Sequence, residues 1–188
     1  MTIKYKIRFF SEWHCGSGLS AGADLDSLVI KDKKGFPYIP GKTIKGLVRE
    51  AVEDLVYFRG NNKEQQIKEA FGYFEEKERS MNKGFCFFTN ATLPEDQQEF
   101  VASKDLQRFL YRATSATAIG TDGIVVEHSL RKTETTIPCE LHGEILDLPE
   151  AIGKEVVESL KLIKRIGLNR NRGLGRCQFL QIEKGNNQ

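Results

Sequence analysis

The sequence lacks the long apolar run that a membrane-spanning helix requires. Hydrophobic residues make up 39% of its 188 positions, yet no uninterrupted apolar stretch approaches the ~18–20 residues of a membrane span. The opening residues MTIKYK also lack the charged, apolar and small-residue regions of a secretory signal peptide. We therefore expect a cytoplasmic protein with no membrane partner.

The cysteine and histidine patterns of metal sites are missing as well. The four cysteines are far apart and form no CxxC pair: Cys15, Cys86, Cys139 and Cys177. The three histidines are equally scattered, without the spacing of zinc ligands. We expect free thiols in a reducing cell and no structural metal ion.

A nucleotide-binding P-loop is absent, although Gly41-Lys42-Thr43 resembles the end of one. In the pattern GxxxxGK[ST] the first glycine stands closer to the lysine than it does here. Five residues separate Gly35 from Gly41, and two of them are Pro37 and Pro40. This spacing excludes a mononucleotide site but leaves a helix start suited to one phosphate of a longer chain.

The charges are unevenly distributed along the chain. The 28 basic and 26 acidic residues nearly cancel, to a net +2. Basic residues are concentrated in Lys31–Arg49 and Lys161–Arg176, on either side of acidic stretches at 64–78 and 95–105. A fold that brings the two basic blocks together has one positive face, which suits a polyanion. The alternative is solvated side chains on unrelated surfaces.

Hydrophobic periodicity predicts a single α+β domain over residues 1–188. Strands are expected at 3–9, 84–93, 133–148 and 177–183, long helices from 40–43 and from Pro149 to Gly167, and shorter helices at 63–74 and 95–113. The major elements follow the order βαββαβ, typical of a ferredoxin-like (RRM-like) palm with an antiparallel sheet and helices on one side. Both basic blocks then lie at one end of the sheet.

The first long helix carries two stripes. The expected buried stripe repeats at helical spacing: Ile44, Leu47, Val48, Ala51 and Leu55. A basic strip begins at the helix start, where Thr43 or Gly41 is expected to cap the free amides: Lys42, Lys45 and Arg49. Because a helix N-terminus itself attracts anions, we expect Lys42, Thr43, Lys45 and Arg49 to contact phosphates.

A second phosphate-binding candidate is the loop at 167–176. It combines three glycines with three arginines: Gly167, Gly173, Gly175, Arg170, Arg172 and Arg176. Glycines allow the backbone to approach a ligand closely, and arginines match phosphate geometry. The alternative is a tight turn with solvated arginines.

Four segments, taken in order, resemble the RAMP superfamily of repeat-associated RNA-binding proteins, and within it the backbone subunits of type III CRISPR effector complexes. The segments are His14–Gly18 after the first strand, Leu25–Asp32 followed by Pro37–Arg49, Gly123–Pro138, and the 167–176 loop. Together they span most of the chain.

The resemblance implies a palm that binds guide RNA through the first helix and the 167–176 loop, beside other RAMP-type subunits in a filament-like antiviral complex. It also implies a protruding β-hairpin thumb, inserted at about 114–136, whose apolar tip wedges between bases. Ile124, Val125 and Val126 match the tip. The alternative for these three residues is a small satellite core.

In the family an aspartate in the loop after the first strand cleaves complementary target RNA with a divalent cation, Mg²⁺ or Mn²⁺. Asp26 falls on that position, and Asp24 is the second choice. If both carboxylates only cap a turn, the chain is a non-catalytic RNA-binding subunit of the same assembly. A third alternative is a stand-alone guide-processing endoribonuclease, in which His14 acts as general base on the 2′-hydroxyl.

Overall fold

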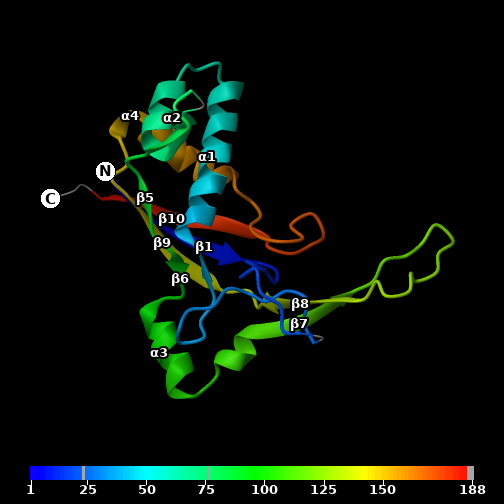
Figure 1. The fold of residues 1–188 in the computed structure, drawn as a ribbon. Helices are drawn as coiled ribbons and strands as arrows, with labels where there is room; N and C mark the ends of the chain where they lie inside the picture. Colours follow the sequence, from blue (N-terminus) through cyan, green and yellow to red (C-terminus); the bar gives the residue numbers. More distant parts are fainter. Residues whose placement is uncertain (23, 76, 186–188) are drawn as a thin grey trace.

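The computed structural model describes residues 1–22, 24–75 and 77–185 (Figure 1). Its central antiparallel sheet has the order β10-β1-β9-β6-β2, with β5 also paired to β9. The strands are β1 (Thr2–Phe9), β2 (Tyr38–Ile39), β5 (Phe87–Phe88), β6 (Ala91–Thr92), β9 (Glu140–Leu146) and β10 (Cys177–Gly185). The first strand therefore lies between the last and the third major strand, which confirms the ferredoxin-like α+β palm.

One face of this sheet is covered by helices. Along β1 the side chains at 3, 5, 7 and 9 are buried, while Lys4 and Arg8 are exposed. Helices α1 (Gly41–Phe58), α2 (Glu64–Phe71) and α4 (Glu150–Leu162) gather on the covered side (Figure 1). Among the helices of the described residues, none is long and apolar enough to cross a membrane.

The buried stripe of α1 differs slightly from the expected one. Ile44 and Val48 are buried as predicted, but the stripe continues through Val52 and Val56. Leu47, Ala51 and Leu55 are only half-buried. The apolar positions of this helix cover a wide arc, so periodicity alone does not locate its centre.

The expected single strand over 133–148 is two strands in different sheets. Strand β8 (Arg131–Thr136) pairs with β7 (Tyr111–Ala116), whereas β9 belongs to the palm. Pro138 lies between them and has no amide hydrogen to continue a ladder. Before Pro138, the Ile137 amide donates a hydrogen bond to the Leu110 carbonyl. After it, the Cys139 carbonyl accepts a hydrogen bond from the Phe9 amide of β1.

The middle of the chain contains more strands than expected. The expected strand over 84–93 is broken into β5 and β6, and a hairpin of β3 (Gly72–Glu75) and β4 (Ser80–Lys83) was not predicted. Helix α2 stops before Gly72, whose φ of +80° leaves the helical region. The expected helix over 95–113 comprises α3 (Glu95–Ser103) and a 3₁₀ turn, η1 (Gln107–Leu110), and its end belongs to β7.

Candidate nucleic-acid interface

The β7–β8 hairpin forms a long projection from the palm (Figure 1). Its ladder starts at the pair Tyr111 and Thr136 and ends at Ala116 and Arg131, and the residues between extend beyond it. At its tip Ile124, Val125 and Val126 are 68%, 56% and 47% exposed. The alternative of a small satellite core for these residues is therefore wrong.

Asp26 lies beside the root of this hairpin, that is, its paired part (111–116 with 131–136), near the outer end of the ladder where Lys132 pairs with Ser115. Its backbone amide donates to the Lys132 carbonyl at 2.8 Å, and the Lys132 amide donates to Asp26 Oδ2 at 2.7 Å. The next residue, Ser27, forms a parallel bridge with Thr133. The Asp26 side chain is thus exposed but fixed in orientation, beside the point where the projection leaves the palm.

Asp24 is held less firmly. Its amide donates to the Ala21 carbonyl at 3.2 Å, and its exposed carboxylate has no hydrogen-bond or ion-pair partner among the described residues. Within those residues no three His, Cys, Asp or Glu side chains gather as a metal site. Mg²⁺ commonly takes one or two protein carboxylates and completes its shell with phosphates and water. Of the two aspartates, Asp26 alone has a carboxylate held in a fixed orientation by a described residue.

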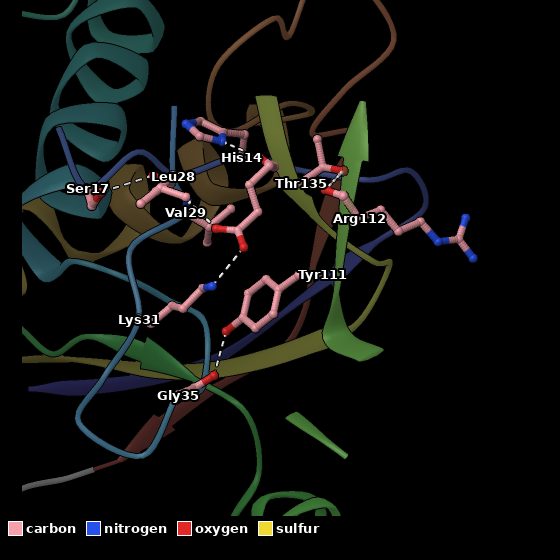
Figure 2. Close-up of polar contacts among 10 residues, drawn as sticks. His14, Ser17, Leu28, Val29, Lys31, Gly35, Tyr111, Arg112 and Thr135 are labelled. Atoms are coloured by element: carbon pink, nitrogen blue, oxygen red, sulfur yellow. Dashed lines mark hydrogen bonds and ion pairs between the residues drawn. The ribbon is translucent and has the colours of Figure 1, made fainter. Parts of the chain in front are cut away.

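Glu134 on β8 holds the loop that carries Asp26. This buried carboxylate accepts the Val29 amide at 3.0 Å and pairs with Lys31 Nζ at 2.7 Å (Figure 2). The Glu134 amide donates to the Ser27 carbonyl. Loop and hairpin root therefore form one packed unit. Sequence reasoning did not identify Glu134, although an acid among threonines was a usable signal.

Lys31 also contacts Tyr111, the first residue of β7. Its ammonium nitrogen lies 3.8 Å from the centre of the tyrosine ring, and the Tyr111 hydroxyl donates to the Gly35 carbonyl at 2.7 Å (Figure 2). Burial, followed by the nearby Glu134 charge, raises the pKa of the Tyr111 hydroxyl. The hydroxyl therefore remains a hydrogen-bond donor at neutral pH.

His14 is 1% exposed, and both of its ring nitrogens have partners. Nδ1 lies 2.6 Å from the Glu134 carbonyl, which accepts only, so Nδ1 carries the proton. Nε2 then accepts from the Ser27 hydroxyl at 3.1 Å. In this position the imidazole supports the loop and does not face solvent.

Two of the three loop glycines at 167–176 allow close packing within the protein itself. Gly167 has φ +98°, and a Cβ there would lie 2.2 Å from the His14 carbonyl oxygen. Gly175 has φ +70°, and a Cβ there would lie 1.9 Å from the Ile166 carbonyl oxygen. Gly173, at φ +94°, has no atom within 4 Å of that position. The loop is therefore tightly packed against the protein at Gly167 and Gly175, whereas its backbone is exposed at Gly173.

The start of α1 lies beside the same loops. Burial raises the pKa of the Cys15 thiol, and the adjacent Thr43 and Lys42 side chains oppose that rise. The N-cap residue is Pro40, which forms no side-chain hydrogen bond to the helix, so the expected capping by Thr43 or Gly41 is wrong. The Gly41 amide donates instead to Asn90 Oδ1 at 2.9 Å.

The basic strip of α1 divides around the helix. Arg49 pairs with Glu53 at 2.7 Å and donates to the Gly72 carbonyl, on the flank near α2. Lys45 lies near Cys86 on that flank. Arg170 instead lines a hollow with Glu50 on the other flank. The loop after β1 that contains His14 and Cys15, the 167–176 loop joined to it by the Leu168 amide, and Lys42 and Thr43 at the start of α1 form one loop cluster. Lys45 and Arg49 lie apart from it.

The arginines of the 167–176 loop also spread out. All three are exposed. Arg172 donates its amide to the Asn169 carbonyl at 2.8 Å, which closes the tip of the loop. Arg176 lies at the loop's end, with its guanidinium 5.9 Å from the centre of the Phe10 ring. Figure 1 shows this loop at the same end of the sheet as the hairpin.

Comparison with known structures supports this architecture. One similar chain belongs to the cryo-EM structure of the Type III-B Cmr-beta bound to cognate target RNA, with a TM-score of 0.71, 11% identity and coverage of 95% of this chain and 96% of that one. Another belongs to the apo state of Type III-B Cmr-beta, with a TM-score of 0.68, 13% identity and 98% coverage of both chains. At such identities the likeness concerns the fold.

The sequence comparison identifies the family. No curated protein matches the sequence significantly. The model of the RAMP superfamily, however, matches residues 6–178, from β1 to the start of β10. That range contains most of the palm, the projecting hairpin and both loops of the candidate interface. The chain therefore belongs to the RAMP superfamily.

Proposed function

We propose that this protein is a guide-RNA-binding backbone subunit of a type III CRISPR antiviral effector complex, and that it cleaves complementary target RNA through Asp26 with Mg²⁺ or Mn²⁺. One observation carries the proposal: the Asp26 carboxylate is fixed by the Lys132 amide at the root of a hairpin whose tip is apolar and exposed. An RNA held along the hairpin passes this carboxylate.

The binding part of the proposal follows from the loops beside that root. Lys42 and the exposed arginines Arg170 and Arg172 offer positive charge at one end of the palm. The half- to two-thirds-exposed side chains of Ile124, Val125 and Val126 suit contact with unstacked bases, which offsets the cost of separating them. The partners would be guide RNA, target RNA and neighbouring RAMP-type subunits.

For cleavage, a ribose 2′-hydroxyl would give its proton to solvent and attack the adjacent phosphorus; the bond to the 5′-oxygen would break, leaving a 2′,3′-cyclic phosphate, and solvent would protonate the departing 5′-oxygen. Asp26 would hold the cation or orient the 2′-hydroxyl through its carboxylate. The cation supplies charge neutralisation at the phosphate. Because the Lys132 amide already fixes Asp26 Oδ2, this side chain loses little conformational freedom when RNA binds. No described residue supports the Asp24 carboxylate in this way.

A non-catalytic subunit of the same assembly is the second candidate. It is favoured by the hydrogen bond from the Lys132 amide to Asp26 Oδ2, because this bond gives the carboxylate a structural role without catalysis. A guide-processing enzyme that uses His14 is disfavoured by the burial of that ring and by its two hydrogen bonds.

The test is a cleavage assay on the guide-loaded assembly with complementary RNA and Mg²⁺ or Mn²⁺. Asp26→Asn keeps an oxygen for the Lys132 amide but removes the charge, so it separates chemistry from structure. We expect regularly spaced products from wild type and Asp24→Ala, and none from Asp26→Asn or Asp26→Ala. Cleavage by Asp26→Asn would refute its catalytic role; no cleavage by wild type would establish the non-catalytic candidate.

A further inference from the structure

A cationic groove lies at the beginning of β10, and Asp26 is not among the described residues that line it. Its volume is about 350 Å³, and its lining consists of Phe10, Lys164, Arg165, Arg176, Cys177 and Gln178. Of these residues only Arg176 belongs to the candidate interface above. No acidic side chain lines the groove within the described part of the chain.

Backbone pairing places three of these side chains in a row. The Phe10 amide donates to the Arg176 carbonyl at 2.8 Å, which continues the β1–β10 ladder by one residue. On its other side Arg176 forms an antiparallel bridge with Arg165. That bridge is supported by a hydrogen bond from the Ile166 amide to the Gly175 carbonyl, at 2.9 Å. Phe10, Arg176 and Arg165 are thus cross-strand neighbours.

This row is electrostatically unfavourable in the free protein. Like charges directly opposite one another on neighbouring strands are destabilising. Arg165 and Arg176 are both exposed, and neither forms an ion pair with a described residue. A bound anion between the two guanidinium groups would remove the repulsion and gain charge-assisted hydrogen bonds.

The aromatic member of the row narrows the class of anion. Phe10 is 50% exposed, and the Arg176 guanidinium lies 5.9 Å from its ring centre. An exposed aromatic ring beside paired arginines is suited to a base and its phosphate in single-stranded nucleic acid. A free phosphate has no base that could stack on the ring.

The groove also has a direct connection to the loop cluster. Arg165 lines both this groove and the hollow beside α1 that contains Arg170 together with the acidic Glu50 and Asp54. A strand of RNA leaving the loop cluster past Arg170 would meet Arg165 next, and then Arg176 and Phe10.

We propose that the row Phe10–Arg176–Arg165 binds single-stranded RNA, with a phosphate between the two guanidinium groups and a base stacked on Phe10. This inference rests on the proposed function, because it adds a contact to the RNA path. It assigns roles to Phe10 and Arg165 and separates Arg176 from the arginines of the loop tip.

The experiment measures binding of a fluorescein-labelled oligouridylate to the purified full-length protein by fluorescence anisotropy at several KCl concentrations. Each phosphate contact with a single strand contributes about 0.7 to the slope of log K against log salt. Arg165→Ala with Arg176→Ala should weaken binding and reduce the slope by about that amount. The exposed Lys154 on α4 provides the matched control as Lys154→Ala.

The ring is tested separately. Phe10→Ala should weaken binding about tenfold, because stacking of a base on an aromatic ring is lost. Phe10→Trp should restore it, and an oligomer of the same length without bases should bind wild type and Phe10→Ala equally. Thermal melting of every variant shows whether the fold is kept.

The outcomes separate this inference from the proposed function. If the double arginine variant binds RNA like Lys154→Ala while Lys42→Ala and Arg170→Ala weaken binding, the groove is not a subsite and the proposed function stands. If the double variant keeps RNA binding but loses self-association in sedimentation, the groove binds protein and the inference is refuted. If wild type binds no RNA, both proposals fail.

Discussion

Glu134 and Lys31 form an ion pair at 2.7 Å although 103 positions separate them in the sequence. The pair joins the loop that carries Asp26 to the root of the projecting hairpin. The Glu134 side chain is 10% exposed and that of Lys31 32%. The orientation of the candidate catalytic carboxylate therefore depends on a largely buried charge.

Replacing that charge should destabilise the protein. Glu134→Gln keeps an acceptor for the Val29 amide but leaves Lys31 without its counterion, so we expect a loss of about 2 kcal/mol in the free energy of unfolding. Urea denaturation measures it. The matched control is Glu53→Gln, which breaks the exposed pair with Arg49 and should cost about 0.5 kcal/mol or less. Equal effects would show that Glu134 has no special role.

The stability of the palm should depend on pH through Glu140 of β9. Burial raises the pKa of this carboxyl, but hydrogen bonds from Arg8 and His142 and the charges of Arg8 and Lys6 outweigh it, so the pKa lies below its usual 4.5. The pKa of Glu140 is thus lower in the folded state than in the unfolded state. The stability that its charge contributes is fully present above the unfolded-state pKa and is lost as the pH falls through the folded-state pKa.

Urea denaturation of wild type and Glu140→Gln should therefore show a difference at pH 6 that shrinks progressively below about pH 4.5. The exposed Glu95 of α3 serves as the control, as Glu95→Gln. His142 Nε2 lies 3.4 Å from Glu140 Oε1, so the comparison is repeated with His142→Gln. A difference that does not change with pH would contradict the assignment.

Sequence periodicity was sufficient for the palm but not for its boundaries. The alternation along β1 identified the central strand, because one face of that strand is buried along its full length. The alternation over 133–148 was misleading, since it continues on both sides of Pro138. The division into two sheets depends on which partners Ile137 and Cys139 find, and those contacts are distant in the sequence.

The candidate site was predictable in part. Asp26 was found through a family resemblance, and its place at the hairpin root depends on Lys132, which no local pattern predicts. The glycines were interpreted as making room for a ligand. Gly167 and Gly175 instead make room for the protein's own carbonyl groups. A glycine in a sequence motif indicates that another group must lie close to the backbone there. It does not show whether that group belongs to a ligand or to the protein.

This difference among the glycines can be tested by alanine substitution. At Gly167 and Gly175 alanine would add strain at positive φ to a backbone clash, so we expect a loss of about 3 kcal/mol or more in the free energy of unfolding. At Gly173 only the strain applies, about 1–2 kcal/mol. Chemical denaturation of the three variants measures the order, and an equal loss at all three would show that the close contacts are unimportant.

The exposed tip of the hairpin should separate stability from function. Ile124, Val125 and Val126 are solvent-exposed, so serine at all three should change the free energy of unfolding by about 0.5 kcal/mol per site or less. If the tip separates bases of bound RNA, the same variant should lose the regular spacing of cleavage products or the cleavage itself. The control is serine at the exposed Met81 of β4, outside the interface. A triple variant that keeps full cleavage with unchanged spacing would show that the tip is not a wedge.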